Sequence, residues 1–446
     1  MNLEKEFFEF YQKYHEEIKC NAAALTNAVR DAEFLRFSAL GFPSHHNENY
    51  KYTELEKPFS FNYGLNIKRL KAQIDASAIF RCNVNGIGSH NFLVLNDDFV
   101  ENPAPAKFPK GVIMGSLRTA AERYPELLAP YYNKLAHAKD DGLVAFNTAF
   151  AQDGFFMYVP DNVVLEKPVQ LVNMMRANVD LMANSRNLIL LGKNAKAQLL
   201  VCEHTAENVN YFANRVTEIF VAENAHLEYY VLENSGTKHS NFSSVLVEQN
   251  ANSKLLTNLI TLHNGITHNN IDIALNGENA ETLLCGMVTC DKNQATNNST
   301  AIYHNKANCQ STELFKYILD DNSRCGFAGK IFVDKNAQKT IALQTNKNIL
   351  LTENARMRTK PQLEIYADDV KCSHGATIGQ LDEQAMFYMQ QRGISKSEAR
   401  LMLMYAFAAD ILDNVHIEPL RDRLKMMVEN RLRNGESKAG TCGICL

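Results

Sequence analysis

An Asn-Ala dipeptide recurs through the middle of the chain, each time followed by an extended run of residues. Asn tolerates the left-handed backbone region, and the small Ala fits a crowded corner. The spacings are 30, 26, 29, 27, 30 and 18 residues, and the pairs start at Asn194, Asn224, Asn250, Asn279, Lys306 (as Lys-Ala), Asn336 and Asn354. A corner that returns every 26 to 30 residues, with short strands between, predicts the coils of a β-solenoid.

Short β-rich runs fill the same region, from about Gly142 to Gly379. They include AQLLVC, TEIFVA, HLEYYVL and KIFVD, and little helical pattern separates them. An antiparallel sandwich with Asn turns at its hairpins is the alternative. Turns in a sandwich are expected every ~8–12 residues, so we favour the solenoid.

Helical patterns flank this core. Apolar residues recur at helical spacing from Met1 to about Phe37, and a second helix is expected over Ser116–Tyr132, capped by Ser116 and divided at Pro125. After Gly379 we expect a helix over Asp382–Arg392, and then a capping box of Ser395 and Glu398 in front of EARLMLMYAFAADIL. Pro419 opens a third helix.

These patterns predict four parts. They are a helical and mixed N-terminal domain over 1–141, a β-helix core over 142–379, a C-terminal helical region over 380–434 and a flexible tail over 435–446. The tail carries Cys442 and Cys445 at C-x-x-C spacing, which we interpret as a thiol pair without function, since it is only half a zinc site.

Composition excludes several classes of function. The 446-residue chain has a net charge of −4, which gives no electrostatic reason to expect nucleic acid. The longest apolar run, Leu401–Leu412, is too short to span a membrane and contains Asp410. The N-terminus is too charged for a signal peptide. Ten scattered cysteines fit reduced thiols, so we expect a cytoplasmic protein with no membrane association.

The stretch PQLEIYADDVKCSHGATIG, Pro361–Gly379, carries the clearest candidate site. Val370, Cys372 and His374 alternate with polar residues and therefore share one face of a strand. A thiol and an imidazole two residues apart can both reach one ligand. Packing of the Cys372 thiol as a small hydrophobe is the competing interpretation, and a histidine on an apolar face is often a hydrogen-bonded core group.

This stretch, together with QLDEQAMFYMQQRGI after it, resembles the C-terminal core signature of the SufB/SufD family of iron–sulfur cluster assembly proteins. Phe146–Leu171 resembles the entry to the shared core. Asn47–Phe59, NENYKYTELEKPF, resembles the N-terminal segment of the SufD branch, although Tyr50 stands where the family usually has Trp. The resemblance implies a right-handed parallel β-helix between N-terminal and C-terminal helices, which agrees with the repeat.

One departure favours the SufD branch. SufB-like chains carry a cysteine just before the paired leucines of the NILL segment, and here Lys347 stands near that place. The resemblance then implies a scaffold that pairs with a SufB-like subunit and binds a SufC-like ATPase through its C-terminal helices, with a homodimer as the alternative in isolation. A transient iron–sulfur cluster would form at the partner interface, with His374 as metal ligand and Cys372 as a further candidate.

No enzyme activity is expected of this chain. No G-x-x-x-x-G-K-[ST] is present, so no nucleotide is expected to bind it and ATP belongs to the partner. Met402, Met404 and Tyr405 are candidate partner contacts, with core packing as the alternative use. Two other functions stay open: a SufB-like scaffold that bears the cluster itself, and a solenoid carbohydrate-active enzyme using carboxylates such as Asp368 and Asp369.

Overall fold

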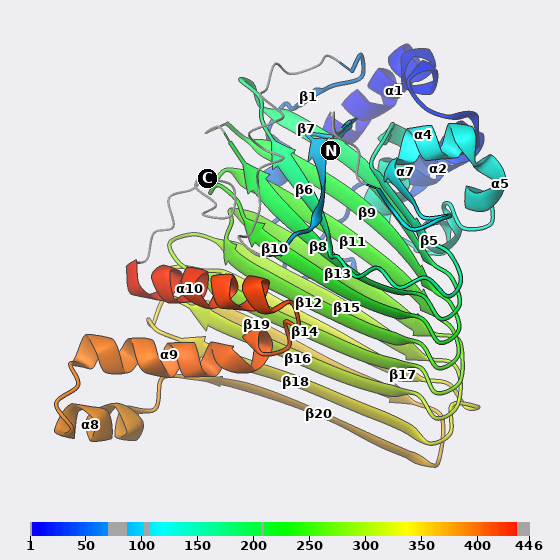
Figure 1. Ribbon diagram of the computed structural model, residues 1–446. Helices are drawn as coiled ribbons and strands as arrows, with labels where there is room; N and C mark the ends of the chain where they lie inside the picture. Colours follow the sequence, from blue (N-terminus) through cyan, green and yellow to red (C-terminus); the bar gives the residue numbers. More distant parts are fainter. Residues whose placement is uncertain (1, 70–86, 102–106, 207–208, 435–446) are drawn as a thin grey trace.

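The core of the protein is a parallel β-solenoid of about seven turns, whose strands alternate between two sheets (Figure 1). The computed structural model describes residues 2–69, 87–101, 107–206 and 209–434. Helices flank the solenoid at both ends of the chain, in blue and cyan at the N-terminus and in orange and red at the C-terminus. The fold predicted from the repeat and from the family resemblance, a parallel β-helix between helical regions, is confirmed.

Each sheet takes every second strand of the solenoid. Sheet A runs in the order β19 (Arg356–Ile365), β17 (Arg324–Val333), β15 (Ala295–His304), β13 (Ile266–Leu275), β11 (His239–Gln249), β9 (Tyr211–Val221), β7 (Leu181–Leu191), β5 (Phe155–Val159) and β4 (Ile113–Ser116), with β1 (Gly64–Leu65) also on β7. Sheet B runs in the order β20 (Val370–Gly379), β18 (Thr340–Leu350), β16 (Gln310–Leu319), β14 (Glu281–Cys290), β12 (Lys254–His263), β10 (His226–Asn234), β8 (Lys196–Thr205), β6 (Val169–Met175), β2 (His90–Leu95) and β3 (Asp98–Val100).

The corners use left-handed residues, as predicted, but not all at the predicted positions. Asn194, Asn224 and Asn279 have φ between 57° and 58°. In the other turns the left-handed residues are Asn252, Asn308 and Lys339, each two or three positions after the predicted Asn250, Lys306 and Asn336. Asn354 has no left-handed backbone. The Asn-Ala dipeptide therefore marks only some of the corners.

At these six corners, the residue after the left-handed position points into the solenoid and must be small. Its side chain is buried at every one of these corners, and the residues are Ala195, Ala225, Ser253, Ala280, Cys309 and Thr340. Ser, Cys and Thr therefore replace Ala where the Asn-Ala pattern shifts. Amide side chains also bond from turn to turn, with Asn194 Nδ2 donating to Asn162 Oδ1 at 2.8 Å and Asn279 Nδ2 to Asn252 Oδ1 at 3.1 Å.

The N-terminal region is two helices where one was expected. α1 (Asn2–Cys20) and α2 (Ala24–Leu40) are separated at residues 21–23. Asn27 Nδ2, in the first turns of α2, donates to the carbonyl of Lys19 near the end of α1 at 2.9 Å. Further on lie the 3-10 turns η1 (Glu48–Tyr50) and η2 (Pro58–Ser60) and the helices α4 (Leu117–Arg123), α5 (Pro125–Leu128), α6 (Lys134–His137) and α7 (Gly142–Phe150). Ser116 caps α4 and Pro125 begins α5, as predicted.

Buried charges join these helices to one another and to sheet A. The guanidinium of Arg30 on α2 donates to the carbonyls of Ala149 and Ala151 at 2.6 and 2.9 Å. Arg186 and Glu218, on neighbouring strands β7 and β9, form an ion pair of 2.7 Å with both side chains almost fully buried. Glu218 also accepts from the backbone amides of Asn133, Leu135 and Ala136. The start of α6 is therefore held against the sheet by a carboxylate.

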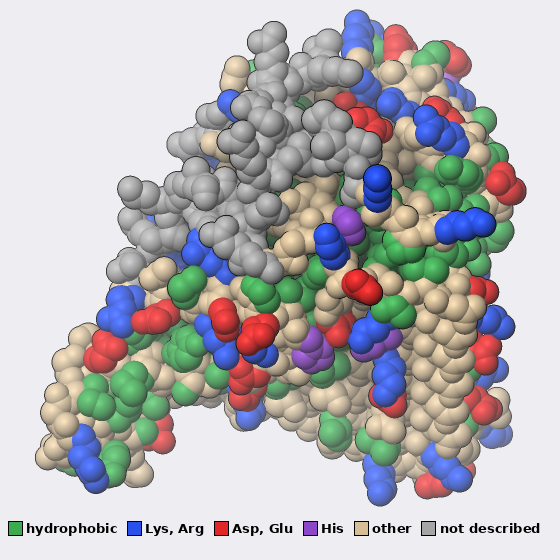
Figure 2. All heavy atoms as spheres, viewed as in Figure 1, with side chains coloured by type: hydrophobic (Ala, Val, Ile, Leu, Met, Phe, Trp, Pro, Cys, Tyr) green, Lys and Arg blue, Asp and Glu red, His purple; other side chains and the backbone are tan. Residues whose placement is uncertain are grey.

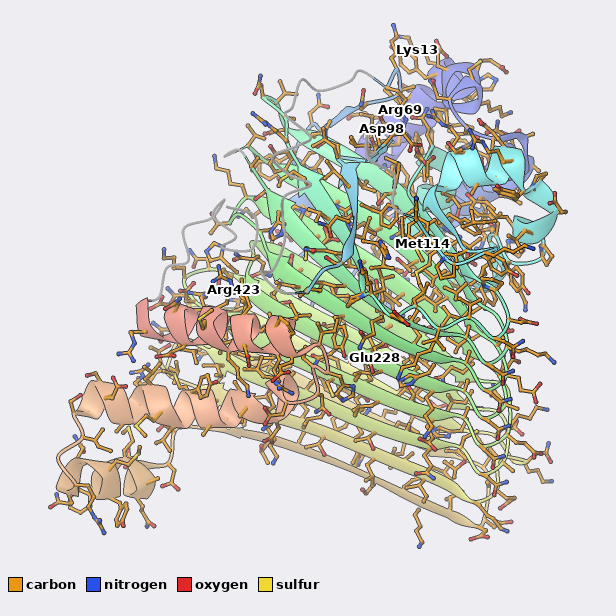
Figure 3. All side chains as sticks on the ribbon, in the orientation of Figure 1. Lys13, Arg69, Asp98, Met114, Glu228 and Arg423 are labelled. Carbon is orange, nitrogen blue, oxygen red and sulfur yellow. The ribbon has the colours of Figure 1, made fainter. Side chains whose placement is uncertain are left out.

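Three C-terminal helices follow the last strand: α8 (Glu383–Gln391), α9 (Lys396–Leu412) and α10 (Glu418–Asn434). α9 and α10 pack on the outer face of sheet B, where Ile411 and Leu420 join Leu256 and Ile260 in one apolar cluster. Beside the link between α9 and α10, Glu228 of β10 (labelled in Figure 3) accepts from the Tyr230 hydroxyl and contacts His416. The predicted tail over 435–446 lies outside the described residues.

The predicted capping box forms only in part. Ser395 Oγ accepts from the Glu398 amide at 3.2 Å, which caps α9. The Glu398 carboxylate binds Arg433 of α10 instead of returning to Ser395. Within the described residues, no helix is long and apolar enough to cross a membrane.

Candidate functional site

The solenoid ends in two unpaired strand edges. β19 is the last strand of sheet A, and β20 is the last strand of sheet B. Each pairs on one side only, with β17 and β18 respectively. The free edge of such a strand presents backbone N–H and C=O groups that can pair with another chain. We call this end of the molecule, formed by β19 and β20, the open end.

The predicted pair Cys372 and His374 lies on β20 and therefore at the open end. In-register pairing places Cys372 beside Ala342 and His374 beside Gln344. Ala342 and Gln344 are buried, so Cys372 and His374 lie on the side of the strand that faces the solenoid interior. Because no further turn covers β20, the His374 side chain is exposed. The predicted strand and the shared face are both confirmed by this register.

Cys372 and His374 differ in their surroundings. Cys372 is half-buried and packs against an apolar cluster that includes Ile331, Val333 and Ala342. Burial raises the pKa of the Cys372 thiol above its ordinary value, which disfavours the thiolate that binds metals. His374 makes no hydrogen bond to any described residue. The imidazole is therefore free to bind a ligand, whereas burial disfavours the thiolate form of Cys372.

A polar column leads from His374 into the solenoid, and sequence reasoning missed it. Gln344 follows in register, and its Nε2 donates to Glu313 Oε2 of β16 at 2.6 Å. Both side chains are buried. Burial raises the pKa of Glu313 to about 7, although its contacts with Thr300 and Gln344 oppose that rise. Glu313, Gln344 and His374 are each about one repeat apart, but the register that aligns them depends on how many residues each corner inserts.

Exposed apolar side chains surround the open end. They are Ile341 and Leu343 on β18, Ile365 and Tyr366 at the end of β19, and Ile378 on β20, with exposed fractions from 36% to 61%. Large exposed apolar groups gathered in one region mark an interface. Lys347, on β18, is exposed but lies on the face opposite to Gln344. The structure does not bring Lys347 to the side of the strands that carries His374.

A second apolar surface lies on α8. No side chain of α8 is buried, and Phe387 and Tyr388 are 63% and 60% exposed. The green area at the lower left of Figure 2 lies over this helix and the neighbouring part of α9. Of the predicted partner contacts on α9, Met402 is exposed, Tyr405 is partly buried and Met404 is buried. We call Phe387, Tyr388 and Met402 the α8 surface.

The remaining predicted groups do not form a ligand cluster. Asp368 and Asp369 are exposed at the corner before β20, where the Asp369 carbonyl accepts from the Lys339 amide at 2.6 Å. Among the described residues, no group of three or more His, Cys, Asp or Glu side chains is placed to hold a metal ion. The two donors at the open end, Cys372 and His374, are thus a partial site.

Comparison with known proteins gives one consistent family. The family model for the SufBD core domain of the SUF system for FeS cluster assembly matches residues 173–407, and the model for the SufBD protein N-terminal region matches residues 1–171. Together they account for most of the chain. No carbohydrate-active family was among these matches, so the comparisons give that alternative no support.

Individual relatives carry the same description. An iron–sulfur cluster assembly SufBD family protein of Synechocystis is 27% identical over 88% of this chain and 88% of its own length. The iron–sulfur cluster assembly protein SufD of Escherichia coli is 35% identical over 57% of this chain and 60% of its own length. SufD of Bacillus subtilis is 27% identical over 73% of this chain and 75% of its own.

Proposed function

The chain belongs to the SufBD family of iron–sulfur cluster assembly proteins, and we propose that it is a SufD-like scaffold subunit that pairs with a SufB-like subunit at the open end of the solenoid. The observation that carries this proposal is the composition of the open end. It combines two unpaired strand edges, exposed apolar side chains and a free imidazole. A partner with a matching edge would continue both sheets.

The nascent cluster is the cargo of this site. Iron–sulfur clusters are usually held by four protein ligands, and this chain offers at most Cys372 and His374 from one strand. The partner would supply the other ligands, so the site would be complete only at the interface. A neutral imidazole is a suitable ligand for ferrous iron. His374 is the stronger candidate of the two, because burial raises the pKa of the Cys372 thiol and so disfavours its thiolate.

A SufC-like ATPase would bind the α8 surface. α9 is fixed to sheet B, where Asn258 Nδ2 donates to the Ile411 carbonyl and the Lys316 ammonium group donates to the Phe407 carbonyl, at 2.9 and 2.8 Å. α8 in contrast buries none of its own side chains. The anchored helix could transmit a movement of the ATPase to the solenoid, while α8 provides the contact.

The test is a matched pair of substitutions in the complex co-purified with the SufB-like and SufC-like subunits. His374→Ala is expected to leave assembly and melting temperature nearly unchanged and to lower iron and sulfide content at least tenfold. Ser373→Ala is the control, since Ser373 is exposed on the opposite face of β20. Full cluster content in His374→Ala with a lowered melting temperature would show that His374 only packs.

A cluster-bearing, SufB-like role is the second candidate, and reconstitution distinguishes it. We expect the isolated chain to hold no stable cluster after anaerobic incubation with iron and sulfide, because one strand provides only two donors. A stoichiometric cluster on the isolated chain would favour the SufB-like role instead.

A further inference from the structure

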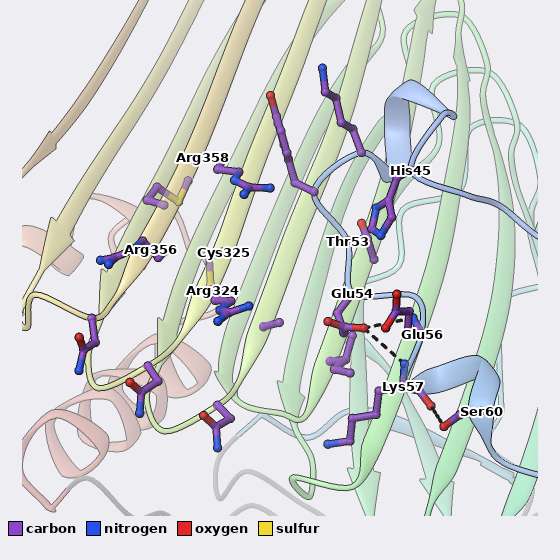
Figure 4. A pocket seen from close by; sticks show the side chains of 18 residues that line it. His45, Thr53, Glu54, Glu56, Lys57, Ser60, Arg324, Cys325, Arg356 and Arg358 are labelled. Atoms are coloured by element: carbon purple, nitrogen blue, oxygen red, sulfur yellow. Dashed lines mark hydrogen bonds between the residues drawn. The ribbon is translucent and has the colours of Figure 1, made fainter.

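A large groove lies on the outer side of sheet A, away from Cys372 and His374. One wall is the segment from His45 to Ser60, which crosses the sheet, and the other is formed by the first residues of β17 and β19 (Figure 4). The groove has a volume of about 1300 Å³. None of the residues used in the proposed function lines it.

Three arginines line this groove on neighbouring strand positions. Arg324 and Arg356 are in-register neighbours on β17 and β19, which places their Cα atoms about 4.8 Å apart. Arg358 follows two residues later on the same face of β19, and its guanidinium lies 5.5 Å from the centre of the Tyr52 ring. All three side chains are exposed. Like charges on directly neighbouring strand positions repel, so this arrangement is destabilising unless an anion compensates it.

No such compensation comes from the part of the chain that the structure describes. None of the three arginines forms an ion pair with a described carboxylate. Arg356 donates to the carbonyls of Glu353 and Ala355, which fixes its position without neutralising its charge. Of the two carboxylates in the groove, Glu54 accepts from the backbone amides of Glu56 and Lys57.

The groove is basic although the chain is acidic. Five cationic side chains line it, Lys51 and Lys57 together with the three arginines, against the two carboxylates Glu54 and Glu56. The whole chain has a net charge of −4. Asn322 and Asn354, exposed at successive corners, add neutral amide donors at the rim.

We propose that this groove binds a small molecule bearing a phosphate or diphosphate group, which Arg324, Arg356 and Arg358 hold together. The guanidinium fork matches phosphate oxygens in a bidentate geometry. Arg324 and Arg356 are neighbours across one strand spacing, and Arg358 is two residues after Arg356 on the same face. Their three positive charges are therefore near enough for one polyanionic group. An acidic peptide spreads its carboxylates along an extended chain, and it fits this cluster less well. The proposal does not depend on the proposed scaffold role.

Pyrophosphate is the first probe, titrated into the full-length chain by calorimetry at constant ionic strength. We expect saturable binding with one site per chain, weakened at least tenfold in the double variant R324Q/R356Q. Arg433→Gln is the matched control, since Arg433 is also an exposed arginine but lies outside the groove, where it pairs with Glu398. Unchanged melting temperatures would show that the variants are folded, and Arg358→Gln provides a second, independent variant.

Two further titrations, with a nucleoside diphosphate and with a poly-glutamate peptide, distinguish an organic phosphate from inorganic phosphate and from an acidic peptide. Tighter binding of a nucleoside diphosphate than of pyrophosphate would support an organic phosphate whose ring contacts Tyr52, and equal binding would support the inorganic group alone. The proposal is overturned if pyrophosphate binding is not saturable, if R324Q/R356Q binds as wild type does, or if a poly-glutamate peptide binds more tightly than pyrophosphate.

Discussion

At the scale of single residues, the buried ion pair between Arg186 and Glu218 is expected to be sensitive to substitution. Both side chains are almost fully buried, and Glu218 also holds the start of α6. Removing one member of a buried pair leaves an uncompensated charge and costs about 3–5 kcal/mol. We expect Glu218→Gln to lower the free energy of unfolding by that amount, as measured by chemical denaturation.

Glu223→Gln is the matched control. Glu223 pairs with Lys193 at 3.1 Å, but both side chains are largely exposed, and exposed pairs contribute about 0–1 kcal/mol. Equal effects of the two substitutions would contradict the structural role of the buried pair.

A second prediction at this scale concerns the pH dependence of stability, because burial raises the pKa of Glu313 to about 7 in the folded protein. The pKa of an unfolded glutamate is about 4.3. Between these values the folded state binds more protons than the unfolded state, so stability is fully present below pH 4 and is lost as pH rises through 7. Glu313→Gln removes this loss.

The expected measurement is a pair of denaturation curves at several pH values. Relative to wild type, Glu313→Gln should gain stability as pH rises from about 4 to 8, by at most about 4 kcal/mol. Glu233, another buried carboxyl with a pKa raised to about 8, contributes its own slope to both proteins and cancels in the difference. Parallel pH curves for the two proteins would refute the assignment.

At the scale of elements, α8 differs from the two helices after it. α9 and α10 cover apolar residues of sheet B, so deleting them would expose the cluster that contains Leu256 and Ile260. α8 covers no such surface. A point substitution on α8 is therefore a cleaner test of partner binding than truncation after Gly379.

We expect Phe387→Asp to weaken capture of the SufC-like ATPase at least tenfold without changing the melting temperature. The reason is that a carboxylate would replace an apolar contact at the centre of the α8 surface, whereas the free protein keeps this side chain in water. Leu35→Asp on α2 is the control, since Leu35 is 70% exposed and far along the chain. Normal ATPase capture by the Phe387→Asp variant would show that the ATPase does not bind at the α8 surface.

At the scale of the whole molecule, the open end is a free sheet edge with apolar surroundings. Such an edge tends to pair with another copy when its proper partner is missing. We expect the isolated chain to form a concentration-dependent homodimer, measured by light scattering after size exclusion, and a SufB-like subunit to replace one copy.

Ile378→Lys, at the free edge of β20, should make the isolated chain monomeric by placing a charge in the contact. Val164→Lys is the matched control, because Val164 is similarly exposed, at 54% against 47%, but precedes β6 near the other end of the solenoid. A dimer that survives Ile378→Lys but not Val164→Lys would place the contact away from the open end.

The sequence alone determined the solenoid, because its signal is local. A left-handed Asn followed by a small residue specifies each corner, and backbone preference is a property of a few neighbouring residues. Where Ser253, Cys309 or Thr340 replaced Ala, the dipeptide shifted, and the predicted corners at Asn250, Lys306 and Asn336 were displaced. The shared face of Cys372 and His374 also followed from strand alternation.

Tertiary structure decided what surrounds those residues. The column Glu313–Gln344–His374 and the arginine pair of Arg324 and Arg356 depend on the register between strands about one repeat apart. The sequence pattern of one strand does not contain that register, since it depends on how many residues each corner inserts. In the same way, Met404 and Met402 have equal apolar character, and only the packing of α9 in the folded protein buries Met404 and leaves Met402 exposed.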